Sequence, residues 1–399
     1  MKSYTSHEGP AEPNHVISSS IERVEELASL MTKQPEAVVM AIRNEAPSII
    51  SDIENEYSRV LSSDQISLTD TAPTMSPSIK SKRLTATCKV LMGENALPRG
   101  RYGVRILALD GGGTRGLVSL QVLKEIQRLS GGRPIHELFD YVIGVSTGAI
   151  LAFMIGALKM PLHEIESKYK ELSKVVFSTN YFQASKRLVT SQSFYDSDEY
   201  EKVLQKIFGD TLLLESGIDS KGPRVACVST LVNRSRIKPY VWRNYNLVFG
   251  KNMEQIHFHG TINSEIWKAI RCSSAAPGYF GEVVINKSYD VSSPTKNTVD
   301  IHQDGGILVN NPSALALSEC SALWPKHKVQ CLVSIGTGRF EPNRSDRGLR
   351  KNTSLMEKVS FIIDSATNVA NVHSLMFETM PEYTYFRFNP YADFFLYKV

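Results

Sequence analysis

Apolar residues follow two different periods along the chain, and the change from one to the other divides it into short segments. Short apolar, β-branched runs predict strands, whereas apolar positions three and four residues apart predict amphipathic helices. The runs predict strands at residues 104–109, 140–145, 224–231, 239–244, 299–303 and 329–335. The helical spacing predicts helices at residues 115–129, 147–158, 162–174, 197–208, 264–272, 312–323 and 354–370. This alternation indicates an α/β domain with a mostly parallel central sheet.

The first hundred residues have a different pattern. Residues 1–15 are polar without periodicity, and we expect them to be disordered. Helical spacing then extends from residue 20 to about 61, and "SLTDTAPTMSPSIKSK" has the composition of a linker. The predicted division is an N-terminal region at 1–100, partly disordered with helices and a linker, a main α/β domain at 101–340, and a C-terminal part at 341–399 that packs a helix and a strand on it.

Composition narrows the class of protein. The 399 residues are 42% hydrophobic and 22% charged, which predicts a soluble, intracellular globular protein with a sizeable core. The net charge of +4 is small for this length and argues against a dedicated nucleic-acid binder. The five cysteines form no CxxC motif and no Cys/His cluster, so neither a disulfide framework nor a zinc site is indicated.

One apolar stretch, residues 141–160, is about long enough to span a bilayer. Its pattern changes from strand-like to helical at a serine between glycines, so we interpret it as a buried strand, turn and helix. Within it, "GVSTG" places Gly144 and Gly148 around Ser146 as G-x-S-x-G. A nucleophile elbow has this pattern because its serine lies on a strained strand-to-helix turn that needs small neighbours. The alternative is a tight turn with a helix-capping serine.

A second glycine-rich turn, "ILALDGGGTRGLVSL" at residues 106–120, allows two interpretations. The glycines match the G-x-G-x-x-G of a dinucleotide site. Such a site also needs an acidic residue near the end of the next strand, but Glu125 and Glu137 fall in the predicted helix and loop, and the next strand ends at Ser146. No Walker lysine follows either. We therefore favour the other interpretation, in which backbone amides stabilise a developing oxyanion by several kcal/mol.

The oxyanion interpretation assigns roles around this turn. Gly111, Gly112 and Gly113 would let amides approach the reacting oxygen. Arg115 would brace the loop or add positive charge, with an ordinary surface arginine as the alternative. Asp110 would fix the loop by accepting amide hydrogen bonds.

A reactive serine needs a base, and "VDIHQDGGILVNNP" supplies Asp304 at a predicted strand end before two glycines. An aspartate can take the serine proton if its surroundings raise its proton affinity. The alternative is an Asp-Gly turn without chemistry. Of the nine histidines, His302 is the best candidate for a triad base, because it lies two residues before Asp304 on the same strand face. We interpret it as structural.

The motifs "DGGGTRG", "GVSTG" and "DGG", in this order, resemble those of the patatin-like phospholipases. The resemblance extends from about Arg101 to Pro390 and is strongest to the membrane-associated, calcium-independent phospholipase A2-gamma group. The segments that carry it are "LFDYVIGVSTGAILAFMIG", "VSTLVNR", "IRCSSAAPGYF", "HQDGGILVNNPSALAL", "VSIGTGR" and "YFRFNP".

The resemblance implies a three-layer patatin-like fold, with the catalytic domain at 101–340. It does not cover the N-terminal region, for which the helical spacing alone predicts helices. It implies a Ser-Asp dyad, with Ser146 as nucleophile and Asp304 as base, and hydrolysis of glycerophospholipid esters without calcium or any other cofactor. The expected partner is a phospholipid membrane surface, bound peripherally inside the cell, at mitochondria, peroxisomes or endoplasmic reticulum. Residues 181–189 are a candidate docking segment.

Three alternatives stay open from the sequence. The dyad could serve a neutral-lipid hydrolase or a transacylase, because acceptor choice depends on pocket shape. The fold could be a non-catalytic lipid-binding relative, although Ser146 and Asp304 are both present. A nucleotide could bind at residues 111–116, and it would then raise thermal stability.

Overall fold

The computed structural model describes residues 89–90, 96–100, 102–177, 195–218, 221–247, 258–287, 298–338 and 369–390. The chain divides into two compact units, Met1–Glu94 with Lys287–Thr298, and Asn95–Asn286 with Val299–Val399. The elements below lie in the second unit, apart from one terminal residue in each of two strands. The helices predicted before residue 62 and the docking segment at 181–189 lie outside the described residues. The predicted division into three regions stays a prediction.

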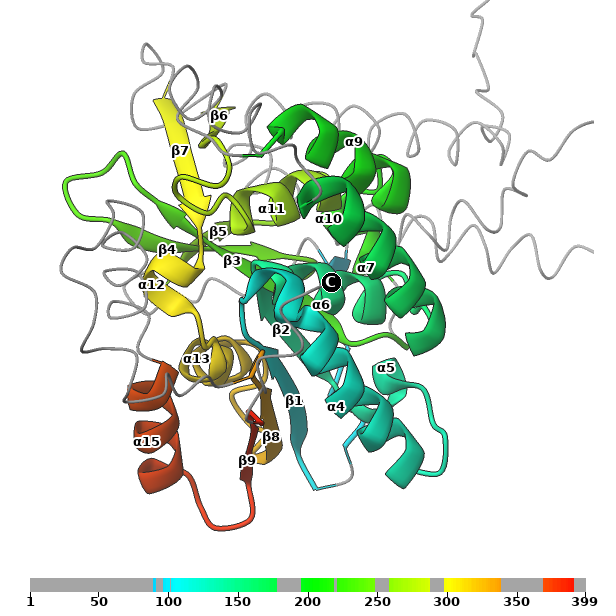
Figure 1. Cartoon of the computed structure of the whole chain (residues 1–399). Coiled ribbons are helices and arrows are strands. Elements are labelled where there is room, and N and C mark those ends of the chain that lie inside the picture. Colours follow the sequence, from blue (N-terminus) through cyan, green and yellow to red (C-terminus); the bar gives the residue numbers. More distant parts are fainter. Residues whose placement is uncertain are drawn as a thin grey trace, which may run out of the picture. The chain divides into compact units, whose positions relative to one another are not determined.

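A mixed sheet forms the centre of the second unit (Figure 1). Its strands are β1 Val104–Leu109, β2 Tyr141–Val145, β3 Arg224–Leu231, β4 Lys238–Arg243, β5 His259–Thr261, β6 Val283–Lys287, β7 Thr298–Asp304, β8 Val329–Ile335 and β9 Tyr385–Phe388. Their order is β5-β4-β3-β2-β1-β8-β9, with β7 beside β3 and β6 beside β7. The neighbours β3-β2, β2-β1, β1-β8 and β8-β9 are parallel. Strand β3 runs antiparallel to β4 and β7. The predicted, mostly parallel sheet is therefore confirmed.

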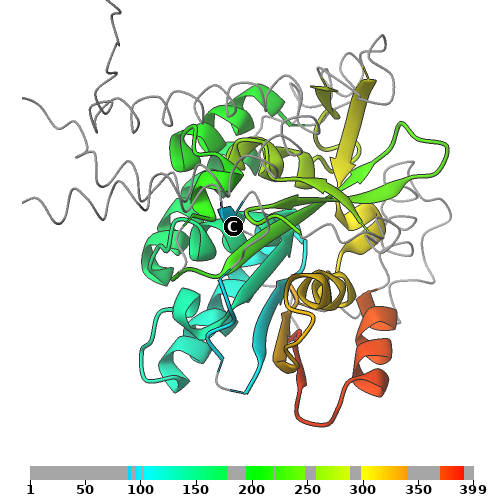
Figure 2. The same ribbon diagram turned by 180° about the vertical axis from the view of Figure 1, so that it is seen from behind.

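Helices cover both faces of the sheet, which gives three layers (Figures 1 and 2). The helices are α4 Gly116–Leu129, α5 Ile135–Leu138, α6 Thr147–Gly156, α7 Leu162–Phe177, α9 Ser197–Phe208, α10 Leu213–Ser216, α11 Ile266–Ser273, α12 Gly306–Val309, α13 Ser313–Leu323 and α15 Val369–Thr379, with a 3-10 helix at Gly113–Arg115. One apolar core joins one sheet face to α4, α6, α7, α9 and α11, and a second joins the other face to α13 and α15. The predicted three-layer arrangement is confirmed.

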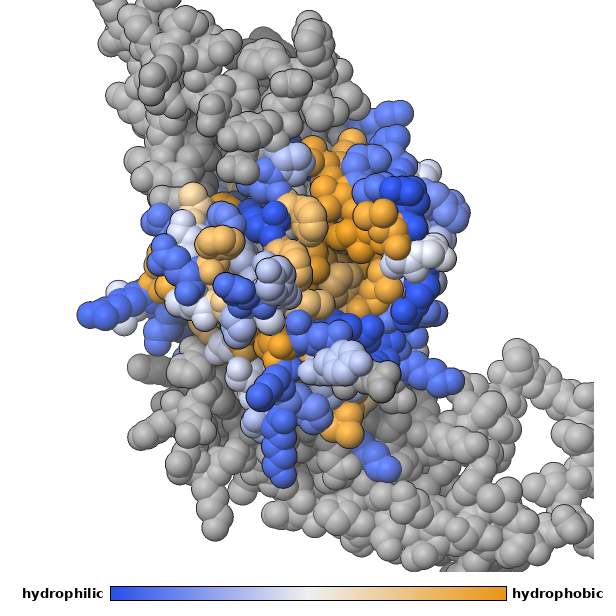
Figure 3. All heavy atoms as spheres, turned by 90° about the horizontal axis from the view of Figure 1, so that it is seen from below, coloured by the Kyte–Doolittle hydropathy of each residue, from blue (hydrophilic) through white to orange (hydrophobic). Residues whose placement is uncertain are grey.

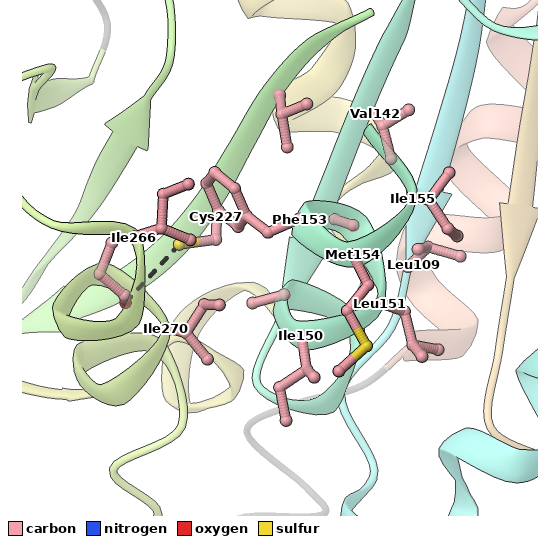
Figure 4. Packing of buried hydrophobic residues seen from close by; sticks show 14 of the residues in the cluster. Leu109, Val142, Ile150, Leu151, Phe153, Met154, Ile155, Cys227, Ile266 and Ile270 are labelled. Carbon is pink, nitrogen blue, oxygen red and sulfur yellow. Dashed lines mark hydrogen bonds between the residues drawn. The ribbon is translucent and has the colours of Figure 1, made fainter. Parts of the chain in front are cut away.

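Helix α6 is buried on every side, because all of its residues from Thr147 to Gly156 are buried. A helix that is apolar all round belongs in the centre of a protein or in a membrane, which explains why residues 141–160 imitate a membrane span. Figure 4 shows Ile150 and Phe153 of this helix packed among side chains of β1, β2, β3 and α11. Among the residues that the structure describes, no helix is long and apolar enough to cross a membrane.

The pattern prediction missed the shortest elements. Helices α5, α10 and α12 have four residues each, and β5 has three, which is too short to show a period. The helix predicted at 354–370 falls outside the described residues except for its last two positions, where α15 begins.

A buried polar cluster joins α13 to the second core. Glu319 accepts hydrogen bonds from Arg243 at 2.6 and 2.7 Å and from the Tyr245 hydroxyl at 2.6 Å. The Tyr141 hydroxyl lies 2.8 Å from that of Tyr245. All four side chains are buried. A buried charge of this kind is tolerated only while its partner is present.

We expect Glu319→Gln to lower the free energy of unfolding by about 3 kcal/mol, because it leaves the Arg243 charge buried without a counter-ion. The measurement is urea unfolding at neutral pH. The matched control is Glu171→Gln, since Glu171 pairs with Lys206 across an exposed surface and should contribute less than about 1 kcal/mol. Equal losses in the two variants would contradict this account.

Candidate active site

Ser146 lies on a strained turn between β2 and α6. Its backbone has φ 54° and ψ −119°, outside the regions that residues with a side chain prefer, and its side chain makes no capping hydrogen bond to the helix. Such strain costs on the order of 1–3 kcal/mol and persists only where the surroundings impose it. The geometry matches a nucleophile elbow and not a helix cap.

The two glycines of "GVSTG" allow strand and helix to approach closely. A Cβ on Gly144 would overlap the carbonyl of Gly148, and a Cβ on Gly148 would overlap the carbonyl oxygen of Leu109 on β1. Both obstacles are backbone atoms, which cannot rotate away. The predicted need for small residues on both sides of Ser146 therefore has a direct steric cause.

Strand register brings Ser146 and Asp304 together from opposite directions. Val145 pairs with Val228 on β3, and the next β3 residue, Ser229, pairs with Asp304 at the end of β7. The Asp304 carboxylate is buried, and the side chain of Ser146 lies near enough to lower its pKa. Its Oδ1 also accepts the Gly306 amide at 2.7 Å. The two residues proposed from separate motifs thus meet in one site.

Burial raises the pKa of Asp304 to about 6, while the nearby Ser146 side chain and the Gly306 amide act in the opposite direction. A carboxylate with this pKa is ionised at neutral pH and still binds a proton more tightly than an exposed aspartate. Both properties suit a group that takes a proton and returns it.

Ser273, the last residue of α11, connects the turn at Ser146 with the turn that follows Asp304. The Ser273 hydroxyl accepts the Ser146 amide at 3.0 Å and donates to the Val228 carbonyl at 2.6 Å. The Ser273 carbonyl accepts the Gly305 amide at 3.1 Å. One residue therefore holds the elbow, β3 and the turn after Asp304. Our sequence analysis assigned Ser273 no role, because no short pattern marks a serine that acts through its neighbours.

The glycine loop lies directly beside the serine. A Cβ on Gly111 would lie 3.2 Å from that of Ser146. The Gly111 amide donates to the Asn310 carbonyl at 3.4 Å, so it is already engaged. The Gly112 and Gly113 amides begin the short 3-10 helix and have no acceptor within it. These two amides are the better candidates for oxyanion donors.

Hydroxyl groups and an arginine fix the orientation of this loop. The Gly113 carbonyl accepts hydrogen bonds from Thr147 at 2.7 Å and from the buried Tyr169 at 2.5 Å. The Arg115 Nε donates to the Gly112 carbonyl at 3.3 Å. With their carbonyls held, the peptide groups of the loop cannot rotate freely. Thr147 and Tyr169 were not identified from the sequence.

Asp110 does not have the contact that we expected. Its carboxylate forms a two-point ion pair with Arg387 on β9, at 2.9 and 2.5 Å, and Arg387 also donates to Ser334 at 2.8 Å. The expectation that Asp110 accepts loop amides is therefore wrong: a charged partner on another strand satisfies it. Burial raises the pKa of Asp110 to about 6, although Arg387 acts in the opposite direction.

These two raised pKa values oppose folding above acidic pH. Asp110 and Asp304 bind protons more tightly in the folded chain than at their ordinary value of 3.8. The contribution of these two carboxyl groups to the free energy of unfolding is greatest below about pH 4 and is lost as the pH rises through about 6. The site therefore keeps two carboxylates at a cost in stability at neutral pH.

His302 belongs to the core and not to a triad. Its Nδ1 lies 3.0 Å from the Ser229 hydroxyl, and its ring packs against those of Tyr240 and Trp242 at 4.9 and 5.1 Å. The structural interpretation of this histidine agrees with its surroundings.

A strained serine elbow, a buried aspartate and a glycine loop on a mostly parallel sheet form the arrangement that is typical of serine hydrolases of the α/β class. Residues 107–317 match the model of the family described as "Patatin-like phospholipase". The chain belongs to this family.

Similar proteins agree with this assignment. The chain is 46% identical to the calcium-independent phospholipase A2-gamma of Rattus norvegicus over 316 residues, which is 78% of this chain and 38% of that protein. It is 33% identical to phospholipase A I of Arabidopsis thaliana over 378 residues, which is 80% of this chain and 28% of that protein. The chain thus spans less than two fifths of either relative.

Among solved structures, VipD from Legionella pneumophila aligns with a TM-score of 0.33 and 14% identity over 69% of this chain and 55% of that one. This likeness is too weak to add to the family assignment.

We expect Gly148→Ala and Gly113→Ala to differ strongly in stability. The first places a methyl group against the backbone carbonyls of Leu109 and Asp110, so the end of β1 and α6 must separate. The second has open space around it, and at φ 57° it costs only about 1 kcal/mol of backbone strain. Thermal unfolding of both variants is the measurement. A Gly148→Ala protein as stable as Gly113→Ala would contradict the steric account of the elbow.

Proposed function

We propose that this chain is a calcium-independent phospholipase that hydrolyses fatty-acyl esters of glycerophospholipids through an acyl-serine intermediate. The placement of Ser146 beside the buried Asp304 carries the proposal, because it brings a nucleophile to a base without a histidine. The names of the relatives from Rattus norvegicus and Arabidopsis thaliana support this substrate class.

In the proposed reaction Asp304 takes the hydroxyl proton as the Ser146 Oγ attacks the ester carbonyl carbon. The negative charge that develops on the carbonyl oxygen meets the amides of Gly112 and Gly113 and the N-terminus of α6. Collapse of this intermediate breaks the ester bond, and the lysophospholipid oxygen receives the proton from Asp304. Water then attacks the acyl-serine, with Asp304 taking its proton and returning it to Ser146, which releases the fatty acid.

The substrate of such an enzyme is held in a bilayer. We therefore propose that the protein acts peripherally at the surface of an intracellular membrane. The position of the site at the carboxyl edge of the sheet supports this, because ligands approach open α/β sheets from that edge.

We expect Ser146→Ala and Asp304→Asn each to lower fatty-acid release by roughly 10⁴-fold or more, since each removes a group that acts at the reacting atoms. The measurement uses phospholipid vesicles with calcium chelated. His302→Asn is the control, because its amide can replace the hydrogen bond to Ser229, and it should keep most of the activity. An inactive but folded His302→Asn protein, or an active Asp304→Asn protein, would refute the dyad.

Activity should depend on the protonation of Asp304. Since the base must be ionised, kcat/KM for a water-soluble ester should rise with pH through about 6 and level off above pH 7. Asp110 titrates in the same range, so Asp110→Asn is the control. Its kcat/KM should still rise with pH near 6, although it levels off at a lower value. If kcat/KM does not change between pH 5 and 8, or if its rise near pH 6 disappears in Asp110→Asn, Asp304 is not the base.

A further inference from the structure

The loop between β3 and β4, together with the first residue of β4, is strongly basic. Residues 232–238 read "VNRSRIK", with three cations and no acid, and residues 233–238 are all exposed. Ile237, between two of the cations, is 47% exposed. Figure 1 shows this loop in green, extending outward from the sheet at the left, and Figure 2 shows it at the right. The chain thus presents an apolar residue between positive charges at the end of a hairpin.

The base of this hairpin is fixed to β7. Asn233 donates to the Val299 carbonyl at 2.5 Å and accepts the Ile301 amide at 3.0 Å. Arg234 forms an ion pair with the buried Asp300. One of the three cations therefore has a structural role, and it holds the loop on the strand that carries Asp304.

The other two cations are available for a partner. No acidic residue in the described part of the chain forms an ion pair with Arg236 or Lys238. Together with Ile237 they form what we call the hairpin tip. A net positive charge beside an exposed aliphatic residue suits an anionic surface with an apolar interior.

The hairpin tip lies at the same edge of the sheet as the site. β3 runs parallel to β2, and Ser229 of β3 is in register with Asp304. Tyr240 of β4 pairs with Ser229, and the residues of the tip lie two to four positions beyond Tyr240, which is roughly 7–13 Å beyond that row at about 3.3 Å per residue. A surface bound by the tip is therefore close to the edge at which β2 ends and Ser146 follows.

Apolar exposure alone does not select a docking surface on this molecule. Figure 3 shows hydrophobic side chains gathered on the face seen from below, bordered by hydrophilic ones. More than half of an ordinary protein surface is apolar. Charge, projection and position relative to the site together distinguish the hairpin tip.

We propose that Arg236, Ile237 and Lys238 dock the protein on the anionic surface of a phospholipid bilayer and so bring the site to its substrate. This inference rests on the proposed phospholipase function. The two cations bind anionic headgroups, and Ile237 enters the interface between headgroups and acyl chains.

The test is co-sedimentation of the whole chain with phosphatidylcholine vesicles, with and without phosphatidylglycerol. Each cation near an anionic membrane contributes about 1 kcal/mol, so Arg236→Gln/Lys238→Gln should lower the partition coefficient for anionic vesicles about 30-fold. The matched control is Lys326→Gln/Lys328→Gln. These exposed lysines precede β8 at the opposite edge of the sheet, and their removal changes the net charge equally, yet it should leave partitioning nearly unchanged. Ile237→Ser should cause a smaller loss that persists at high salt.

The outcomes separate docking from catalysis. Equal losses in the two double variants, no loss in the hairpin variant, or equal binding of wild type to neutral and anionic vesicles would each overturn the docking proposal. Hydrolysis of a water-soluble ester should be the same in both double variants, because neither changes the site. A wild-type protein that binds anionic vesicles through the hairpin tip but releases no fatty acid would refute the phospholipase and leave the docking surface standing.

Discussion

The backbone of Ser146 is the constraint on which the site depends. Its conformation is unfavourable for any residue with a side chain, so the surroundings must supply the free energy that keeps it. Close approach of α6 to β1, made possible by Gly148, prevents the turn from relaxing. The Ser273 hydroxyl binds the amide of the strained residue itself. Packing and hydrogen bonding thus fix the serine from two sides, and the helix that follows is buried along its whole length.

The order of the strands explains how distant segments share one site. Parallel pairing of β1, β2 and β3 places their carboxyl ends, and the turns that follow them, along one edge. β7 reaches this edge from the antiparallel direction and ends in Asp304. The glycine loop, the serine and the aspartate therefore come from three separate connections. Each connection is held by contacts outside its own motif, as Arg387 and Tyr169 show.

Sequence patterns predicted the parts of the molecule that local chemistry determines. The bounds of β1, β3 and β8 agree with the structure, because long buried strands carry a clear apolar signal. Ser146 and Asp304 were found because each lies between glycines or before them in a short motif. Ser273 and Arg387 were not found, since their roles depend on partners more than a hundred residues away. Asp110 was misinterpreted for the same reason: its neighbours in sequence suggested amide donors, whereas its neighbour in space is a guanidinium.

The ion pair between Asp110 and Arg387 has a consequence for the timing of synthesis. Its two residues are 277 positions apart, and at 5–20 residues per second a ribosome needs roughly 14–55 s to connect them. In the last part of this interval, after Asp304 has been made, the nascent chain contains both Ser146 and Asp304, but the carboxylate next to the glycine loop still has no counter-ion. We therefore expect the glycine loop of a growing chain to lack its fixed conformation until β9 has left the ribosome and joined the sheet. The activity that we propose would thus begin only after β9 has joined the sheet.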